Sequence, residues 1–133
     1  MGLLIDTNIL IACERGVLDI DKALPKHGDD AVFLSVISAS ELLHGVHRAP
    51  DEKSRARRLA FVERILSGME ILDVDLSVAR VHSEIWSDLA GKGQLIGAHD
   101  LWLAASALAN DCSLVTRNVR EFERVPGLSL EVW

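Results

Sequence analysis

The chain has 133 residues, of which 49% are hydrophobic and 26% are charged, a composition typical of one globular domain and not of a disordered protein. Its 14 Lys and Arg residues against 20 Asp and Glu residues give a net charge of −6. This balance argues against a simple electrostatic nucleic-acid binder, but it is compatible with an enzyme that reaches nucleic acid through metal ions and a local basic patch.

Short apolar runs alternate with helical patterns along the chain. In the first half we predict a strand at 3–6, a helix at 8–16, a weak helix at 19–28 that Pro25 interrupts, a strand at 31–35, and helices at 38–50 and 51–68. In the second half we predict a strand at 69–75, helices at 75–93 and 100–111, a strand at 113–118, a turn or short helix at 120–127, and a strand at 128–133.

Strands that alternate with helices indicate parallel βαβ units. The expected fold class is therefore α/β, a small three-layer domain over residues 1–133 with a mostly parallel central sheet of four to five strands flanked by helices. In sheets of this kind ligands bind outside the carboxyl ends of the strands. The search for a site therefore starts just after each predicted strand.

Polar side chains gather where these strands end. Asp6 ends the first strand inside the apolar run LLIDTNILI, and Thr116 and Asn118 end the fourth. Glu41 lies in the helix after the second strand, and Asp100 opens the helix before the fourth. Because an ionised carboxylate among apolar residues costs several kcal/mol unless it is compensated, Asp6 is the least ordinary of these residues.

Each of these residues also has an ordinary structural interpretation when it is taken alone. Glu41 completes a Ser38-x-x-Glu41 capping box, and Asp100 stabilises a helix N-terminus. Asn118 is a common turn residue, and Asp6 can cap the first helix. It is the coincidence of these residues at one sheet edge that favours a functional site.

Asp6, Glu41 and Asp100 together would repel one another and have raised pKa values in a site without a metal. A divalent cation removes that conflict, and oxygen ligands without His or Cys at zinc spacing suit Mg²⁺ or Mn²⁺. A magnesium ion held by few carboxylates keeps several water molecules, which suits phosphate chemistry. The sequence therefore indicates metal-dependent phosphoryl or phosphodiester chemistry.

Four segments together resemble the PIN-domain superfamily and, within it, the VapC-type toxin ribonucleases. They are LLIDTNILI, SASELLHGV, DLWLAASA and LVTRNVREFERVPGL, in the order that the family has them. The resemblance implies a PIN-like fold and a Mg²⁺-dependent endoribonuclease that cuts structured RNA such as tRNA or rRNA. It also implies a VapB-type antitoxin partner and a homodimer.

The resemblance maps the first three acids of the family onto Asp6, Glu41 and Asp100. Many PIN domains carry a fourth acid near the end of the fourth strand, where this chain has the neutral Asn118. Glu121 is close by, but its place before a core-like phenylalanine indicates a structural role. One firmly held ion is therefore expected.

The same mapping implies roles for the site residues. We expect Asp6 and Asp100 to bind Mg²⁺, and Glu41 to bind the ion or orient a water molecule. Thr116 and Asn118 are expected to position water or a phosphate oxygen by hydrogen bonds.

An acidic ribonuclease needs local positive charge for its substrate. Arg117 and Arg120 flank Asn118 and are predicted to contact substrate phosphates. A second basic group on or near the 51–68 helix is either a solvated face or an RNA contact; it comprises Arg48, Lys53, Arg55, Arg57, Arg58 and Arg64. Arg15 suits either substrate or an antitoxin carboxylate.

The histidines form no triad or zinc spacing, so surface or packing roles are favoured for His27, His44, His47, His82 and His99. His44 and His99 nevertheless lie close in sequence to Glu41 and Asp100. Trp86 and Trp102 are expected to lie in the core or at a dimer interface.

Several other classes of protein fit less well. A haloacid-dehalogenase-type phosphatase needs an acid where this chain has Asn8, and a receiver domain needs a lysine beyond Lys92, where there is none. The alternatives kept open are a PIN fold that has lost activity and serves as a binding module, and another metal-dependent α/β phosphoesterase.

No membrane segment is predicted, because the apolar run 101–109 is too short to cross a bilayer. The start of the chain lacks a basic region and a cleavage site, so we expect no signal peptide. Cys13 and Cys112 match neither a disulfide framework nor a zinc site. We therefore expect a reduced, cytoplasmic protein.

Overall fold

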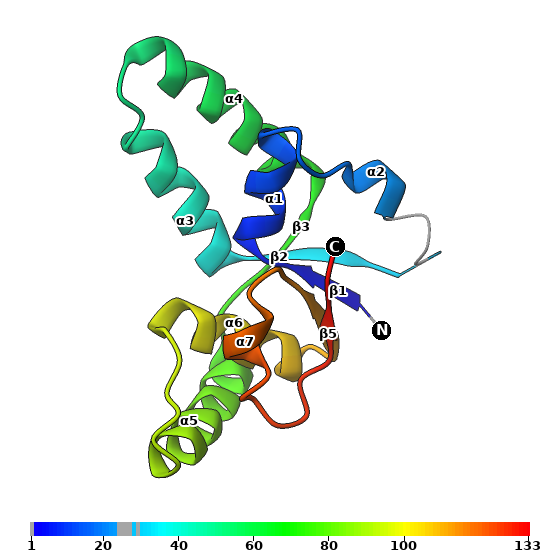
Figure 1. Cartoon of the computed structure of the whole chain (residues 1–133), viewed down its shortest axis with the longest axis vertical. Coiled ribbons are helices and arrows are strands. Elements are labelled where there is room, and N and C mark those ends of the chain that lie inside the picture. The colour runs from blue at the N-terminus through cyan, green and yellow to red at the C-terminus, as the bar shows by residue number, and fades with distance from the viewer. Residues whose placement is uncertain (1, 24–27, 29) are drawn as a thin grey trace.

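The structure is a computed structural model that describes residues 2–23, 28 and 30–133 (Figure 1). Its strands are β1 (Gly2–Ile5), β2 (Val32–Ser35), β3 (Glu70–Leu72), β4 (Cys112–Val115) and β5 (Leu130–Glu131). Its helices are α1 (Thr7–Glu14), α2 (Ile20–Ala23), α3 (Val36–His47), α4 (Glu52–Gly68), α5 (Leu76–Gly91), α6 (Ala98–Ala109) and α7 (Val119–Phe122). The predicted break at Pro25 and the surface role of His27 lie outside the described residues.

The strands form one sheet in the order β3-β2-β1-β4-β5, and every pairing is parallel. Strand β1 is central and fully buried, with Leu4 between Phe33 of β2 and Leu114 of β4. Because all strands run the same way, their carboxyl ends meet at one edge of the sheet. The predicted α/β fold with a parallel sheet is confirmed.

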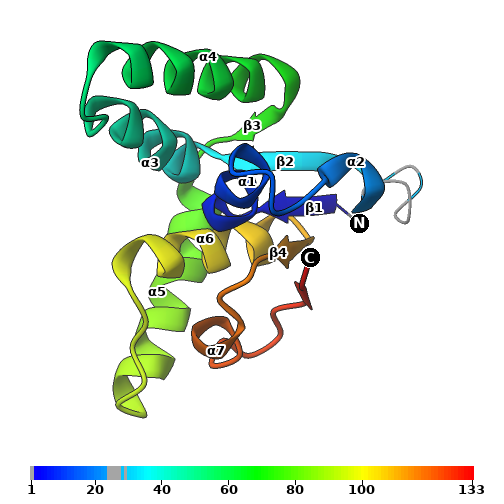
Figure 2. The same cartoon turned by 45° about the horizontal axis from the view of Figure 1, so that its top comes forward.

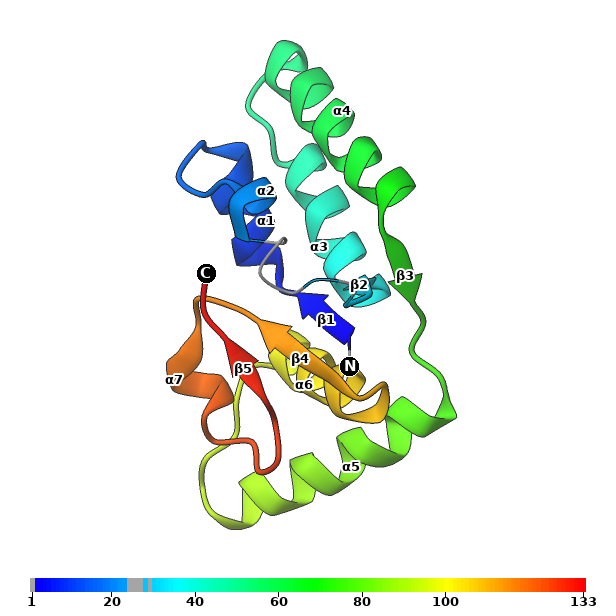
Figure 3. The ribbon, with the colours of Figure 1, turned by 90° about the vertical axis from the view of Figure 1, so that its right-hand side faces the viewer.

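Alternate residues of β1 point to opposite faces of the sheet and so into two cores. Leu4 belongs to a cluster with residues of α5, α6 and β4, whereas Leu3 and Ile5 belong to a cluster with residues of α1, α3 and α4. Figures 2 and 3 show α5 and α6 on one side of the sheet and α1, α3 and α4 on the other. The result is the expected three-layer arrangement.

Helices α3 and α6 each begin two residues earlier than the sequence indicated, and both shifts affect the site. Helix α3 begins at Val36, because Ser35 at the end of β2 caps it directly by accepting a hydrogen bond from the Ile37 amide at 3.1 Å. The predicted capping box of Ser38 and Glu41 is therefore wrong: Ser38 is buried inside the helix and Glu41 lies in its second turn. The Glu41 side chain is thus available for contacts beyond its own helix.

Helix α6 begins at Ala98, so Asp100 lies in its first turn and not at its start. Asp75 caps α5 by accepting a 3.0 Å hydrogen bond from the Val78 amide. Trp102 packs against the core and stacks on His82 with ring centroids 3.7 Å apart, whereas Trp86 is 52% exposed and so lies outside the core. Within residues 2–23 and 30–133, no helix has the length and apolarity needed to cross a bilayer.

Candidate active site at the carboxyl edge of the sheet

Asp6 lies directly after β1 and is only 7% exposed. It occupies the N-cap position of α1, but its side chain makes no capping hydrogen bond. Instead its Oδ2 accepts a hydrogen bond of 2.8 Å from the hydroxyl of Thr116, which follows β4. Burial raises the pKa of Asp6, the Thr116 hydrogen bond opposes that rise, and the negative charge of Glu41 adds to it.

Thr116 is fully buried and joins the ends of the two central strands. Its hydroxyl also accepts hydrogen bonds from Asn8 Nδ2 at 3.3 Å and from the Asn118 amide at 2.9 Å. Asn8 Oδ1 in turn accepts a hydrogen bond from the Arg117 amide at 3.2 Å. This network holds the segment after β4 against the start of α1 and fixes the Asp6 carboxylate.

Asp100 reaches the same edge from the first turn of α6, and Asn118 Nδ2 donates to its Oδ2 at 3.3 Å. Burial raises the pKa of Asp100 to about 7, aided by a hydrogen bond with Glu121 and by the negative charges of Asp6, Glu121 and Glu41. Three other carboxylates thus act on Asp100 in addition to burial. The four carboxylates therefore form one electrostatic cluster.

Glu121, for which the sequence indicated a structural role, lies against Asp100. It lies in α7 with its side chain against Asp100, while the next residue, Phe122, is fully buried in the core. The structural role expected from this position belongs to Phe122, and Glu121 faces the site. The spacing of three residues from Asn118 puts both side chains on one face of a helical turn, a signal that the sequence contained.

Glu41 is the least committed of the four acids. Its Oε1 lies 2.8 Å from Nδ1 of His99, the exposed residue before Asp100. Among the described residues, no three His, Cys, Asp or Glu side chains lie close enough to hold an ion as they stand. Closing such a set requires a carboxylate to rotate, and Glu41, held only by an exposed imidazole, has the freedom to do so.

The donor chemistry at this edge nevertheless fits a hard divalent cation. Asp6 and Asp100 are carboxylates withdrawn from solvent, and the negative charge of Asp6 helps to raise the pKa of Asp100. A cation with oxygen ligands would relieve that repulsion, and Mg²⁺ needs only one or two protein carboxylates because it retains water. Asp6 and Asp100 are therefore the residues that would hold it, with Glu41 and Glu121 beside them.

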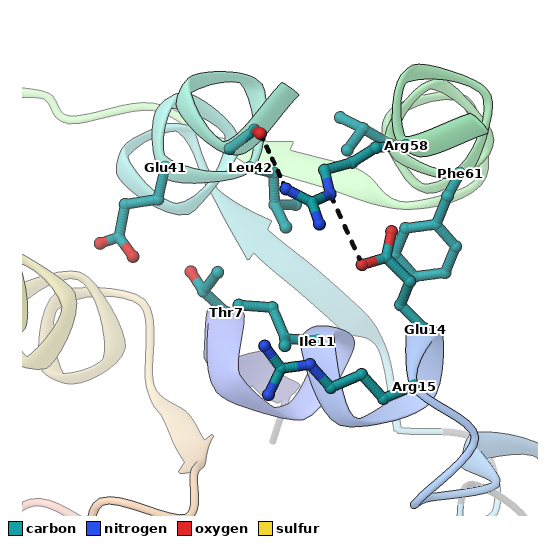
Figure 4. A pocket seen from close by; sticks show the side chains of 10 residues that line it. Thr7, Ile11, Glu14, Arg15, Glu41, Leu42, Arg58 and Phe61 are labelled. Carbon is teal, nitrogen blue, oxygen red and sulfur yellow. Dashed lines mark hydrogen bonds and ion pairs between the residues drawn. The ribbon is translucent and has the colours of Figure 1, made fainter. Parts of the chain in front are cut away.

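A groove leads away from the site between α1, α3 and α4 (Figure 4). It has a volume of about 110 Å³, and its floor is apolar, with Ile11, Leu42 and Phe61. Arg58 lies across it, donating from Nη1 to the Gly45 carbonyl at 3.0 Å.

Glu14 and Thr7 also line the groove. Glu14 lies 3.9 Å from the Arg58 guanidinium. Thr7 lines the end next to Glu41, and its buried hydroxyl has no hydrogen-bond partner within the described ranges.

The predicted substrate arginines, Arg117 and Arg120, are both exposed. Arg117 Nε donates to the carbonyl of Trp133 at 3.2 Å, so its side chain is directed to the end of the chain. Arg120 is exposed on α7. The second basic group is partly gathered around a hollow of about 480 Å³ at α1 and α4, lined among others by Arg15, Arg57, Arg58 and Arg64.

Known proteins are similar to this chain in sequence and in fold. A family profile described as "PIN domain" matches residues 3–128. "Ribonuclease VapC1" of Rickettsia felis is 38% identical over 130 residues, covering 98% of this chain and 95% of that protein. "tRNA(fMet)-specific endonuclease VapC" of Salmonella typhimurium is 40% identical over 102 residues, covering 75% of this chain and 74% of that one.

Solved structures agree with the sequence matches. VapBC2 from Rickettsia felis, bound to a promoter DNA fragment, superposes with a TM-score of 0.90 at 29% identity and covers 100% of this chain and 99% of that one. VapBC from Salmonella typhimurium, also bound to DNA, gives 0.89 at 31% identity and covers 100% and 98%. The resemblance seen in the sequence is thereby confirmed, and the chain belongs to the PIN-domain family and, within it, to the VapC proteins.

Proposed function

We propose that this protein is a Mg²⁺-dependent endoribonuclease that acts as the toxin of a VapBC-type toxin–antitoxin pair, with structured RNA such as tRNA or rRNA as its substrate. The observation that carries the proposal is the buried Asp6 carboxylate beside Asp100, whose pKa is raised to about 7. Relatives with 38% and 40% identity are named ribonuclease and tRNA(fMet)-specific endonuclease, which supports RNA as the substrate.

The proposed cofactor is one Mg²⁺ ion, for which Mn²⁺ can substitute, held by Asp6 and Asp100 with Glu41 or Glu121 completing the set. Bound there, the ion would act as a Lewis acid and lower the pKa of a water molecule. Many PIN domains carry a fourth acid near the end of the fourth strand, where this chain has the neutral Asn118. Glu121 supplies that fourth acid here.

The chain's own residues prepare the site for phosphodiester hydrolysis. Thr116 holds one oxygen of Asp6 by its 2.8 Å hydrogen bond, so that the carboxylate is presented in one orientation. Asn118 holds Oδ2 of Asp100 in the same way at 3.3 Å. Glu41, which faces the adjoining hollow, orients the attacking water and takes its proton on a carboxylate oxygen.

The test is cleavage of total tRNA in the presence of Mg²⁺ by the unsubstituted protein and by Asp6→Asn. The substitution keeps the side-chain shape and removes its charge, so we expect cleavage to fall by about 100-fold or more. Asp73→Asn, at an exposed position in the loop before α5, is the matched control and should leave cleavage unchanged. Undiminished cleavage by Asp6→Asn would sink the assignment and leave the catalytically silent binding module as the better account.

A VapB-type antitoxin is the proposed partner, since the similar solved structures are VapBC complexes. The groove between α1, α3 and α4 offers an apolar floor with Arg15 beside it, which suits a short apolar segment carrying an acidic residue. Phe61→Ala should weaken binding of the antitoxin encoded beside this protein by about tenfold, because it removes the aromatic floor. If Phe61→Ala retains its affinity for the antitoxin in isothermal titration calorimetry, the antitoxin binds another face of the protein.

We also propose a homodimer in a reducing cytoplasm. Leu76 and Trp86 on α5 are 67% and 52% exposed, which leaves apolar surface for a second copy to cover. Cys13 and Cys112 are both free thiols, as a reducing compartment would keep them. Light scattering after size exclusion should give about twice the 14.6 kDa chain mass, and a monomer mass at high concentration would contradict the dimer.

A further inference from the structure

We propose that the hollow beside Glu41 is a subsite for a phosphate of the RNA strand adjoining the bond that is cut, and that Arg48 and His44 of α3 bind this phosphate. This inference rests on the proposed ribonuclease function and deepens it. It predicts that the substrate strand runs from the acids at the sheet edge along α3.

The helical spacing of α3 builds the subsite. Glu41 and His44 are three residues apart on α3, and Arg48, four residues further on, is the C-cap of the helix with a helical backbone conformation. The three residues therefore follow one face of the helix. With a rise of 1.5 Å per residue, His44 lies about 4.5 Å and Arg48 about 10 Å along the axis from Glu41. All three line a hollow of about 420 Å³, together with Ser40 and Thr7. A row of donors thus begins at the catalytic edge.

Arg48 is available for a ligand. It is exposed. Its backbone amide donates to the His44 carbonyl at 3.2 Å, but within the described part of the chain its side chain has no hydrogen-bond or ion-pair partner. Arg58 is occupied by the Gly45 carbonyl and by Glu14, and Arg117 donates to the carbonyl of Trp133. A guanidinium group without a partner, in the same hollow as a catalytic acid, matches the geometry and charge of a phosphate.

His99 also lines the hollow and contacts Glu41. Its Nδ1 lies 2.8 Å from Glu41 Oε1, so one oxygen of the only carboxylate lining the hollow is already paired. A phosphate entering beside Arg48 and His44 therefore meets one guanidinium cation, one imidazole and one carboxylate whose Oε1 already contacts His99. The chain carries a net charge of −6, which makes such a local site necessary for an RNA backbone.

The lining favours RNA over an antitoxin segment. Ile11 is the only large apolar residue of this hollow, whereas the neighbouring groove has Leu42, Phe61 and Val62 as well. Apolar side chains of a peptide would find their place in that groove. The polar hollow lacks such a floor and offers hydrogen-bond donors instead.

The test measures binding and cleavage separately. Fluorescently labelled total tRNA is titrated at several salt concentrations against Asp6→Asn protein with and without Arg48→Ala or His44→Ala, and cleavage kinetics are measured in the active background. We expect Arg48→Ala to raise Kd and KM about five- to tenfold, to leave kcat within about twofold, and to reduce the salt slope by about 0.7 to 0.9, as loss of one phosphate contact does. His44→Ala should raise Kd about two- to fivefold.

Matched controls share the helix or the charge. His47→Ala alters an exposed histidine of α3 that lies outside the hollow, and Arg80→Ala alters an exposed arginine of α5. Both should leave Kd, KM and the salt slope unchanged. Arg48→Lys keeps the charge without the planar guanidinium, so it should retain the salt slope while Kd rises by about two- to threefold; it also serves if the alanine variant folds poorly.

The outcomes separate this subsite from the function on which it rests. Cleavage by the unsubstituted protein, with Arg48→Ala indistinguishable from the controls, overturns the subsite alone. Loss of antitoxin affinity in Arg48→Ala with unchanged tRNA binding also overturns the subsite, and it would show that the hollow binds the antitoxin. Absence of both cleavage and tRNA binding in the unsubstituted protein overturns the ribonuclease function.

Discussion

Thr116 Oγ1 donates a 2.8 Å hydrogen bond to Asp6 Oδ2 although 110 residues separate the two. Both side chains are buried, and both follow central strands of a parallel sheet. Thr116 is thus the direct partner of Asp6, whose carboxylate interrupts the first apolar run of the chain. The bond also joins two segments whose only common feature in the sequence is their position after a strand.

Thr116→Val tests that hydrogen bond, because valine has nearly the same shape and lacks the hydroxyl. Asp6, Asn8 and the Asn118 amide each lose their partner on this hydroxyl. We expect the free energy of unfolding to fall by about 1–3 kcal/mol and kcat to fall about 10- to 100-fold. Urea unfolding and RNA cleavage measure the two effects, and Thr116→Ser should restore most of both. An unaltered kcat in the valine variant would show that Asp6 needs no orienting donor.

Asp100 predicts how stability depends on pH without added metal. Its pKa is raised to about 7 in the folded state, against 3.8 for the ordinary group. Between those values the unfolded chain has lost a proton that the folded protein still holds, so this residue makes the protein less stable as pH rises from about 4 to 7. Below that window it costs nothing, and above it the cost is complete.

Asp100→Asn removes this cost. Because the residue is only partly buried, we expect a gain of about 1–2 kcal/mol at pH 8, or roughly 4–7 °C in Tm, and little gain at pH 4. Differential scanning calorimetry at the two pH values, with EDTA present, measures it. An equal change in Tm at both values would contradict the raised pKa.

Glu121→Gln tests whether the acid of α7 belongs to the metal site. Removing its charge leaves the carboxylates less attractive to a cation, so the affinity for Mn²⁺ should fall about tenfold. Electron paramagnetic resonance of free Mn²⁺ measures this without any cleavage assay. Glu123→Gln, an exposed acid two residues further on, is the matched control and should bind Mn²⁺ as the unsubstituted protein does. Equal affinities in both variants would return Glu121 to a purely structural role.

Metal removal gives a separate prediction for stability. A cation that binds the folded state alone stabilises it by mass action, by about 2.7 kcal/mol at a concentration of 100 times Kd. We therefore expect Mg²⁺ to raise Tm at pH 8 relative to EDTA, and expect Asp6→Asn to abolish most of that rise. A Tm that does not respond to Mg²⁺ would count against the metal site.

Gly2 predicts a local effect in the sheet. A Cβ atom there would lie 2.7 Å from Cε2 of Phe33, a residue of the neighbouring strand β2. Gly2→Ala should therefore lower the free energy of unfolding by about 1–3 kcal/mol. Gly91→Ala, at the end of α5, meets nothing within 4 Å and should be neutral or slightly stabilising. A neutral Gly2→Ala would mean that the Phe33 ring moves at no cost.

The sequence by itself determined the architecture of this protein. Alternation of apolar runs with helical patterns predicted the parallel three-layer fold, because each periodicity reports which face of an element is buried. Position after a strand was enough to bring Asp6, Thr116 and Asn118 to one edge.

Only the tertiary structure decided which side chains meet there. In the structure Asp6 accepts a hydrogen bond from Thr116, Glu121 contacts Asp100, and Glu41 contacts His99. The tertiary structure also corrected the start of α3, since Ser35 caps that helix directly from the end of β2. These contacts join residues far apart in the chain or depend on where a short helix begins, and local patterns carry neither kind of information.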